Sequence, residues 1–189
     1  MSTVPFSELV DTMKRAAGAL REAEVPFLLA GGIACWARGG PETDHDVDFL
    51  VKPDDAERAL DALASAGMRA ERPPEGWLFK AWADETFIDL IFETSEGPVG
   101  DEHFERGENR EVHAVRMRIA SLEDILVTKL LALNEMDLDY GPVVEISRSL
   151  REQVDWDHVR ERTAGSPYAR AFFTLVEELA VAPPPRVVR

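Results

Sequence analysis

The sequence predicts an α/β domain followed by a helical C-terminal portion. Up to about residue 120, apolar residues at helical spacing alternate with short apolar segments that are typical of buried strands. Beyond that point only helical patterns follow. We therefore expect an α/β core at residues 1–120, a helical region at 121–182 and a flexible tail at 183–189. A chain of 189 residues suits one compact domain with such an extension.

Periodicity and turn residues define the predicted elements. The core elements are helices at 6–22, at 33–38 and from Pro53 to a stop at Gly67, and strands at 27–30, 46–51, 68–70, 77–82, 86–92 and 112–119. Residues 93–110 are polar and rich in glycine, and we interpret them as a loop. Ser121 and Asp124 resemble a capping box that opens the first C-terminal helix. Further helices are predicted near 143–152, from Trp156 and at 168–180.

Composition restricts the partners that the chain can have. The net charge of −15 disfavours long nucleic acids, which bind mainly through lysine and arginine contacts to phosphates, and favours a small or cationic acceptor. The single cysteine excludes an intramolecular disulfide. The sequence has no signal peptide and no apolar segment of the roughly 20 residues that span a bilayer. These features predict a soluble, cytoplasmic protein without a membrane partner, and leave a partner protein open.

Two aspartates lie close together in the predicted strand at 46–51. Residues two apart in a strand face the same side, so Asp46 and Asp48 should project together while Val47 points into the core. Paired carboxylates repel each other unless water, a proton or a cation intervenes. Mg²⁺ and Mn²⁺ prefer such oxygen ligands. The alternative is a solvated strand end, which also carries acidic pairs.

A third carboxylate makes the pattern more specific. Asp89 lies inside the apolar strand at 86–92, where an isolated charge loses its hydration unless it is paired. The alternative is a residue at a strand edge that contacts water. On a strand next to the first pair, Asp89 would complete a three-carboxylate cluster able to hold two metal ions.

Two glycines could form the phosphate-binding part of the site. Gly31 and Gly32 follow the short strand at 27–30, and glycine lets backbone N–H groups approach a phosphate closely. A glycine pair alone is more often a simple turn. Its position shortly before the acidic strand favours the functional interpretation.

This arrangement resembles the DNA polymerase β nucleotidyltransferase superfamily. That superfamily has a Gly-Gly or Gly-Ser turn, an Asp-x-Asp or Asp-x-Glu strand and a third acidic residue on an adjacent strand. Ala37-Arg38-Gly39 also resembles the Ala-Arg-Gly of minimal nucleotidyltransferases, and the stretch from Gly31 to Asp48 looks close to small aminoglycoside nucleotidyltransferases and to AbiEii-type toxins. The helix after Ser121, with Lys129, resembles one that follows the core in many of these proteins. The likeness covers roughly residues 25–135 and implies a mixed sheet flanked by helices.

The resemblance also implies roles for individual residues. Asp46, Asp48 and Asp89 would bind Mg²⁺ or Mn²⁺ and act in catalysis, with Asp89 as the general base. Gly31 and Gly32 would hold the β- and γ-phosphates of a nucleoside triphosphate. Two cations would add phosphate contacts, namely Arg38 and Lys129, although each could equally be a structural or solvated helix residue. Strand alternation alone does not decide whether Lys80 enters the site, and Asp44 and His45 are expected to be polar loop residues.

Three functions remain open from the sequence. The first is transfer of a nucleoside monophosphate to a hydroxyl of a small acceptor, such as an aminoglycoside-like antibiotic, with release of pyrophosphate. The second is a toxin-like enzyme that modifies tRNA or protein. The third is a non-catalytic nucleotide-binding module, which the presence of all three carboxylates disfavours.

Overall fold

The computed structural model describes residues 5–43 and 46–185 of the chain, which divides into two compact units. The first unit comprises Met1–Ala37 with Glu42–Ser121, and the second comprises Arg38–Pro41 with Leu122–Arg189. Part of the tail expected at 183–189 falls on residues 186–189, outside the described residues. No helix of the described segments is long and apolar enough to cross a membrane.

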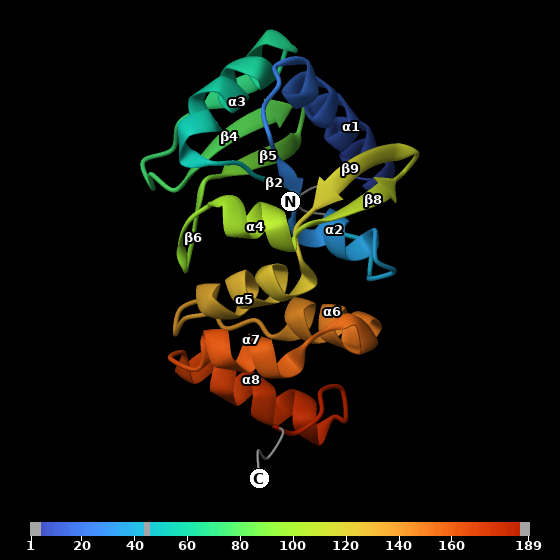
Figure 1. Ribbon diagram of the computed structural model, residues 1–189, viewed down its shortest axis with the longest axis vertical. Helices are drawn as coiled ribbons and strands as arrows, with labels where there is room; N and C mark the ends of the chain where they lie inside the picture. The colour runs from blue at the N-terminus through green and yellow to red at the C-terminus, as the bar shows by residue number, and fades with distance from the viewer. Residues whose placement is uncertain (1–4, 44–45, 186–189) are drawn as a thin grey trace. The chain divides into compact units, whose positions relative to one another are not determined.

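A mixed sheet of seven strands forms the centre of the first unit (Figure 1). Its strand order is β3-β4-β5-β2-β1-β9-β8. The strands are β1 Leu28–Leu29, β2 Asp46–Leu50, β3 Arg69–Glu71, β4 Leu78–Ala83, β5 Thr86–Ile91, β8 Glu108–Val112 and β9 Val115–Ile119. Strand β2 pairs with β5 in parallel and with β1 in antiparallel orientation, so the acidic strand lies in the interior of the sheet.

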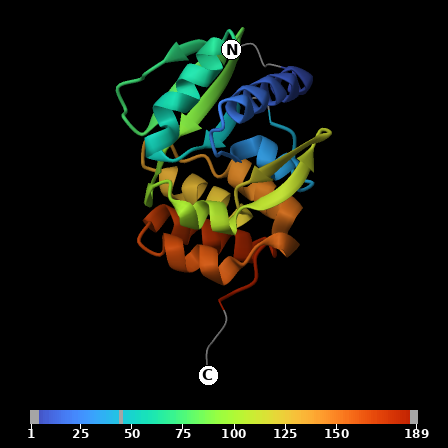
Figure 2. The same ribbon diagram turned by 45° about the horizontal axis from the view of Figure 1, so that its top comes forward.

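Two amphipathic helices cover one face of this sheet. Helix α1 (Phe6–Glu22) and helix α3 (Pro53–Ser65) lie side by side and pack against the strands (Figures 1 and 2). The apolar residues that recur at helical spacing in α1 are all fully buried, namely Leu9, Met13, Ala16, Ala17 and Leu20. Their helical spacing gives α1 a continuous apolar stripe, which explains why this helix was predictable with its bounds.

The interpretation of residues 93–110 as a loop is wrong. This segment contains a small two-stranded sheet, a helix and an edge strand of the main sheet: β6 Glu93–Thr94, β7 Gly97–Pro98, α4 Asp101–Arg106 and β8 Glu108–Val112. The buried ring of His103 accepts a hydrogen bond from the Gly100 N–H through Nδ1 at 3.1 Å, which supports the first turn of α4. Strands β8 and β9 join through His113 and Ala114, both with positive φ. Neither is a usual residue for such a hairpin turn, so the sequence predicted a single strand at 112–119 where the structure has the turn and β9.

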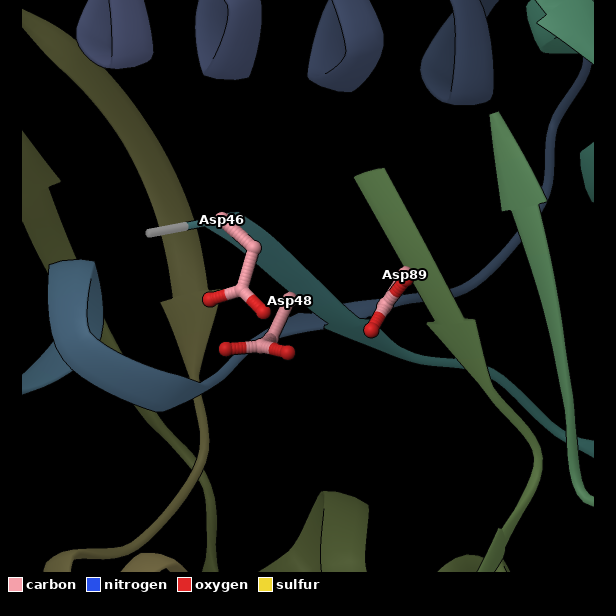
Figure 3. A group of neighbouring side chains, drawn as sticks. All are labelled: Asp46, Asp48 and Asp89. Atoms are coloured by element: carbon pink, nitrogen blue, oxygen red, sulfur yellow. The ribbon is translucent and has the colours of Figure 1, made fainter. Parts of the chain in front are cut away.

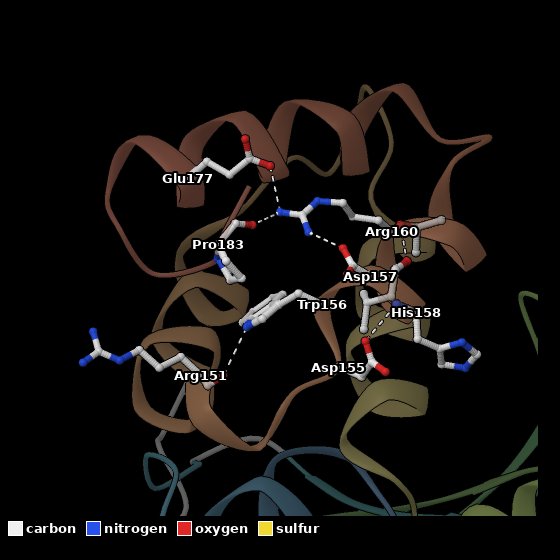
Figure 4. Close-up of polar contacts among 10 residues, drawn as sticks. Arg151, Asp155, Trp156, Asp157, His158, Arg160, Glu177 and Pro183 are labelled. Carbon is white, nitrogen blue, oxygen red and sulfur yellow. Dashed lines mark hydrogen bonds and ion pairs between the residues drawn. The ribbon is translucent and has the colours of Figure 1, made fainter. Parts of the chain in front are cut away.

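The second unit is helical. Its elements are α5 Leu122–Ala132, α6 Gly141–Leu150, the 3₁₀ turn η1 Arg151–Gln153, α7 Trp156–Thr163 and α8 Pro167–Glu178. Polar contacts connect α7 to its neighbours (Figure 4). Arg160 Nη2 donates to Glu177 Oε1 of α8 at 2.8 Å and to the Pro183 carbonyl, while the guanidinium lies 4.6 Å from the Phe173 ring centroid. Asp155 caps α7 by accepting the His158 N–H.

A buried ion pair joins α5 to α7. Arg162 Nη2 lies 2.7 Å from Asp124 Oδ1, and the two side chains are only 13% and 5% exposed. Asp124 is the residue that the sequence suggests for a capping box. In the structure its carboxylate forms an ion pair with Arg162 on another helix.

Candidate active site

Three carboxylates gather on one face of the main sheet (Figure 3). Asp46 and Asp48 project from β2 and Asp89 from β5, and one oxygen from each lies within 4.8 Å of the others. Asp46 and Asp48 are half-buried and Asp89 is buried. The carboxylates thus form one cluster of oxygen donors.

Strand register explains why Asp48 and Asp89, 41 positions apart in the sequence, meet. In the parallel pairing of β2 with β5, Asp48 lies directly opposite Asp89. Val47 and Ile88 are also opposite each other, point to the other face and are fully buried. Burial of these apolar neighbours holds both strands in one register, because a shift by one residue would turn the aspartates into the core.

The glycine turn lies against this cluster. Gly31 has φ +60°, and a Cβ placed on it would lie 1.6 Å from Asp48 Oδ2. The preceding Ala30 N–H donates to the Asp48 carbonyl at 2.9 Å, which fixes the turn to β2. At Gly32 a Cβ would lie 2.6 Å from the Thr43 Cβ. Both glycines are therefore required by close approach, and Gly31 by approach to a carboxylate of the cluster itself.

Gly31→Ala is expected to lower kcat/KM for nucleotidyl transfer, the reaction that the resemblance implies, at least about a hundredfold. The reason is that the methyl group must displace the Asp48 carboxylate by about an ångström or more. Gly67→Ala is the matched control. Gly67 also has positive φ (+85°), but a Cβ there meets nothing within 4 Å. The control therefore carries backbone strain without a collision, and steady-state kinetics should show near-normal activity. Equal losses in both variants would mean that the contact with Asp48 does not matter.

Lys80 is a charged neighbour of the cluster that the sequence left undecided. It lies on β4 opposite Asp89, and its Nζ donates to Asp89 Oδ1 at 2.9 Å. The signal that could have found it is the hairpin turn. A turn of two residues, Asp84 and Glu85, pairs Ala83 with Thr86 and therefore Lys80 with Asp89. The strands expected at 77–82 and 86–92 leave a turn of three residues, 83–85, which does not pair Lys80 with Asp89.

The donor set fits a hard divalent cation. Carboxylate oxygens are the ligands that Mg²⁺ and Mn²⁺ prefer, and three of them converge here from two adjacent strands. The adjoining glycine turn keeps side chains away from Asp48 on that side. The cluster can therefore bind a metal ion.

Comparison with solved structures relates this arrangement to known proteins. The antibiotic-resistance factor ANT(2″)-Ia aligns in its solution structure with a TM-score of 0.66 and 14% identity, over 93% of this chain and 98% of the other. Its crystal structure in complex with adenylyl-2″-tobramycin aligns with a TM-score of 0.64 and 15% identity, over 86% and 98%. A nucleotidyltransferase-like protein from Paracoccidioides brasiliensis aligns at 0.52 and 14%, over 96% of both chains. This chain has the nucleotidyltransferase fold.

A lincosamide antibiotic adenylyltransferase has the same fold. The lincosamide antibiotic adenylyltransferase LnuA, with lincomycin bound, aligns with a TM-score of 0.54 and 14% identity over 81% of this chain and all of the other. The sequence matches no protein-family model. It also has no significant match among curated proteins. At these identities the comparisons establish the α/β architecture with its helical C-terminal portion.

The two predicted phosphate-binding cations belong to the second unit. Arg38 follows α2 (Gly31–Trp36), is buried, and its carbonyl accepts a hydrogen bond from Gln153 Nε2 at 3.1 Å. Lys129 lies near the end of α5 and is half-buried. The carboxylates belong to the first unit, so the phosphate roles of Arg38 and Lys129 stay predictions. Asp44 and His45 lie outside the described residues.

Proposed function

We propose that this protein is a metal-dependent nucleotidyltransferase that moves a nucleoside monophosphate from a nucleoside triphosphate to a hydroxyl of a small-molecule acceptor. The observation that carries the proposal is the convergence of Asp46, Asp48 and Asp89 within 4.8 Å beside a glycine turn. The fold shared with the antibiotic-resistance factor ANT(2″)-Ia and with the lincosamide antibiotic adenylyltransferase LnuA supports it.

Each part of the site has a role in this reaction. Asp46, Asp48 and Asp89 would hold Mg²⁺ or Mn²⁺. The bound metal would reduce the charge of the triphosphate and stabilise the leaving oxygen. The backbone of Gly31 and Gly32 would bind the β- and γ-phosphates, with Arg38 and Lys129 as further phosphate contacts.

Asp89 would also take the proton of the acceptor. The acceptor oxygen attacks the α-phosphorus, the bond from that phosphorus to the bridging oxygen breaks, and pyrophosphate leaves. Asp89 Oδ1 accepts a hydrogen bond from Lys80, so we assign the proton to Oδ2. Asp89→Asn should accordingly affect transfer more than triphosphate binding.

A cationic acceptor suits the charge of the protein. The net charge of −15 attracts amines and repels polyanions such as tRNA. One of the related structures contains an adenylylated tobramycin, and another binds lincomycin. We therefore propose an aminoglycoside-like antibiotic or a similar amine-bearing alcohol as the acceptor. The single cysteine suits the reducing interior of the cell, where we propose that the protein acts.

Two measurements test this function in sequence. Each nucleoside triphosphate with Mg²⁺ or Mn²⁺ is first tested for thermal stabilisation, where ligand at a hundred times its Kd should stabilise the protein by about 2.7 kcal/mol. Pyrophosphate release is then followed while candidate amine-bearing alcohols are added. We expect release that depends on both metal and acceptor. Absence of stabilisation with every triphosphate and both metals would contradict the proposal, and stabilisation without transfer to any acceptor would favour a binding module.

A further inference from the structure

Lys80 extends the acidic cluster into a row of charges across three neighbouring strands. Asp48 on β2 lies opposite Asp89 on β5, and Asp89 lies opposite Lys80 on β4. The contact between Lys80 Nζ and Asp89 Oδ1, at 2.9 Å, is both a hydrogen bond and an ion pair. The side chains are 31% and 12% exposed, so water screens this pair less than a surface pair.

The other neighbours of Lys80 leave Asp89 as its anionic partner. Glu71 on β3 lies opposite Lys80 in register, but its carboxylate accepts from Trp82 Nε1 at 2.9 Å and contacts Arg69 at 3.5 Å. Lys80 Nζ also lies 5.7 Å from the ring centroid of Phe87. The ring and the carboxylate together favour one position of the ammonium, beside the cluster.

At this position the ammonium of Lys80 repels any cation that approaches the cluster. Three ionised carboxylates would attract a divalent ion with three negative charges, and the ammonium cancels one of them at close range. The hydrogen bond also uses Oδ1 of Asp89, so a metal without other ligands gains less from this residue. A bound triphosphate outweighs this repulsion, because it adds several negative charges and its own oxygen ligands for the metal.

We propose that Lys80 is a positioning residue that weakens divalent-metal binding to the nucleotide-free protein, so that metal and triphosphate bind together. This inference rests on the proposed function, since it requires a metal site at the carboxylates. It predicts strong positive coupling, in which nucleotide raises metal affinity and metal raises nucleotide affinity by the same factor.

Mn²⁺ binding to the whole protein, measured by calorimetry without nucleotide and with a non-hydrolysable triphosphate, tests the inference. Lys80→Met keeps most of the apolar stem and removes the ammonium. We expect it to bind Mn²⁺ about tenfold more tightly than the native protein without nucleotide, since the lost repulsion acts at short range but is partly screened. The factor by which nucleotide tightens Mn²⁺ binding should fall by a similar amount. Lys80→Arg, which keeps the charge, should stay within about twofold of the native protein.

Lys52→Met is the matched control. Lys52 also forms an ion pair with an aspartate, Asp101, and its side chain is 35% exposed, close to the 31% of Lys80. Asp101 is not one of the three clustered carboxylates, so this variant should leave Mn²⁺ affinity within about twofold. Circular dichroism spectra and melting temperatures check that all variants fold.

The outcomes separate this inference from the function on which it rests. If Asp48→Asn removes Mn²⁺ binding while folded Lys80→Met binds Mn²⁺ no more tightly than the native protein, the metal site stands and the role of Lys80 is wrong. An equal gain in affinity in Lys52→Met would also overturn it, because the effect would then reflect net charge. If the native protein binds no Mn²⁺ with or without nucleotide, both proposals fail together.

Discussion

Asp48→Asn is expected to lower kcat/KM for nucleotidyl transfer at least about a thousandfold, equivalent to roughly 4 kcal/mol of transition-state stabilisation. Asparagine has nearly the same shape as aspartate, so it keeps the close packing against Gly31, where a Cβ would lie 1.6 Å from Asp48 Oδ2. What it removes is one charge from a cluster whose oxygens lie within 4.8 Å of one another. The fold should therefore survive, and relief of repulsion should leave the metal-free protein equally stable or slightly more stable.

Asp84→Asn is the matched control for this loss of charge. Asp84 is exposed, lies in the turn between β4 and β5, and has φ +54°, a conformation that asparagine adopts readily. The same change in net charge should there leave transfer within about twofold. Initial rates of pyrophosphate release and Mn²⁺ calorimetry on both variants provide the comparison. Full activity in Asp48→Asn would remove this residue from the metal site.

Asp124→Ala is expected to have the largest effect on stability, lowering the free energy of unfolding by about 3 to 5 kcal/mol. Truncation leaves the Arg162 guanidinium, only 13% exposed, without the carboxylate that lies 2.7 Å away. The loss is larger than that of a surface pair because the guanidinium is largely removed from water. Denaturant unfolding followed by circular dichroism measures it.

Two further variants test whether loss of the buried carboxylate is the cause. Asp157→Ala breaks a contact with Arg160 at 3.5 Å, in which the aspartate is 39% exposed. Arg160 is 13% exposed, like Arg162, but keeps Glu177 at 2.8 Å, so this variant should cost less than about 1 kcal/mol. Arg162→Met combined with Asp124→Ala removes both charges and should recover more than half of the loss. Similar destabilisation in Asp124→Ala and Asp157→Ala would contradict the importance of the buried pair.

The acidic residues and their shared face were predictable because strand alternation is a local property. Asp46 and Asp48 are two residues apart, and that spacing alone places them on one side of β2. The proximity of Asp89 is not local. It depends on the parallel pairing of β2 with β5, which leaves no signal in either strand, and the likeness to nucleotidyltransferases supplied that expectation.

The strands and the helix at 93–110 could not be predicted from local composition. Its glycines and charged residues are typical of loops, yet Glu108–Val112 pairs with Val115–Ile119 along the edge of the sheet. Charged residues are common on edge strands because they discourage association with other chains. Without knowledge that this strand lies at an edge, its composition indicated a loop.

Because β2 and β5 lie in the interior of the sheet, the backbone that carries the carboxylates should stay folded in the absence of ligand. Strand β5 is paired with β2 and β4, and β2 is paired with β5 throughout and with β1 at Phe49 and Leu50, so most of their amides can exchange with solvent only when the sheet itself opens. Deuterium uptake in β2 and β5 should consequently be among the slowest in the first unit, and a backbone that stays folded without ligand would reduce the entropy cost of ordering the carboxylates when a ligand binds.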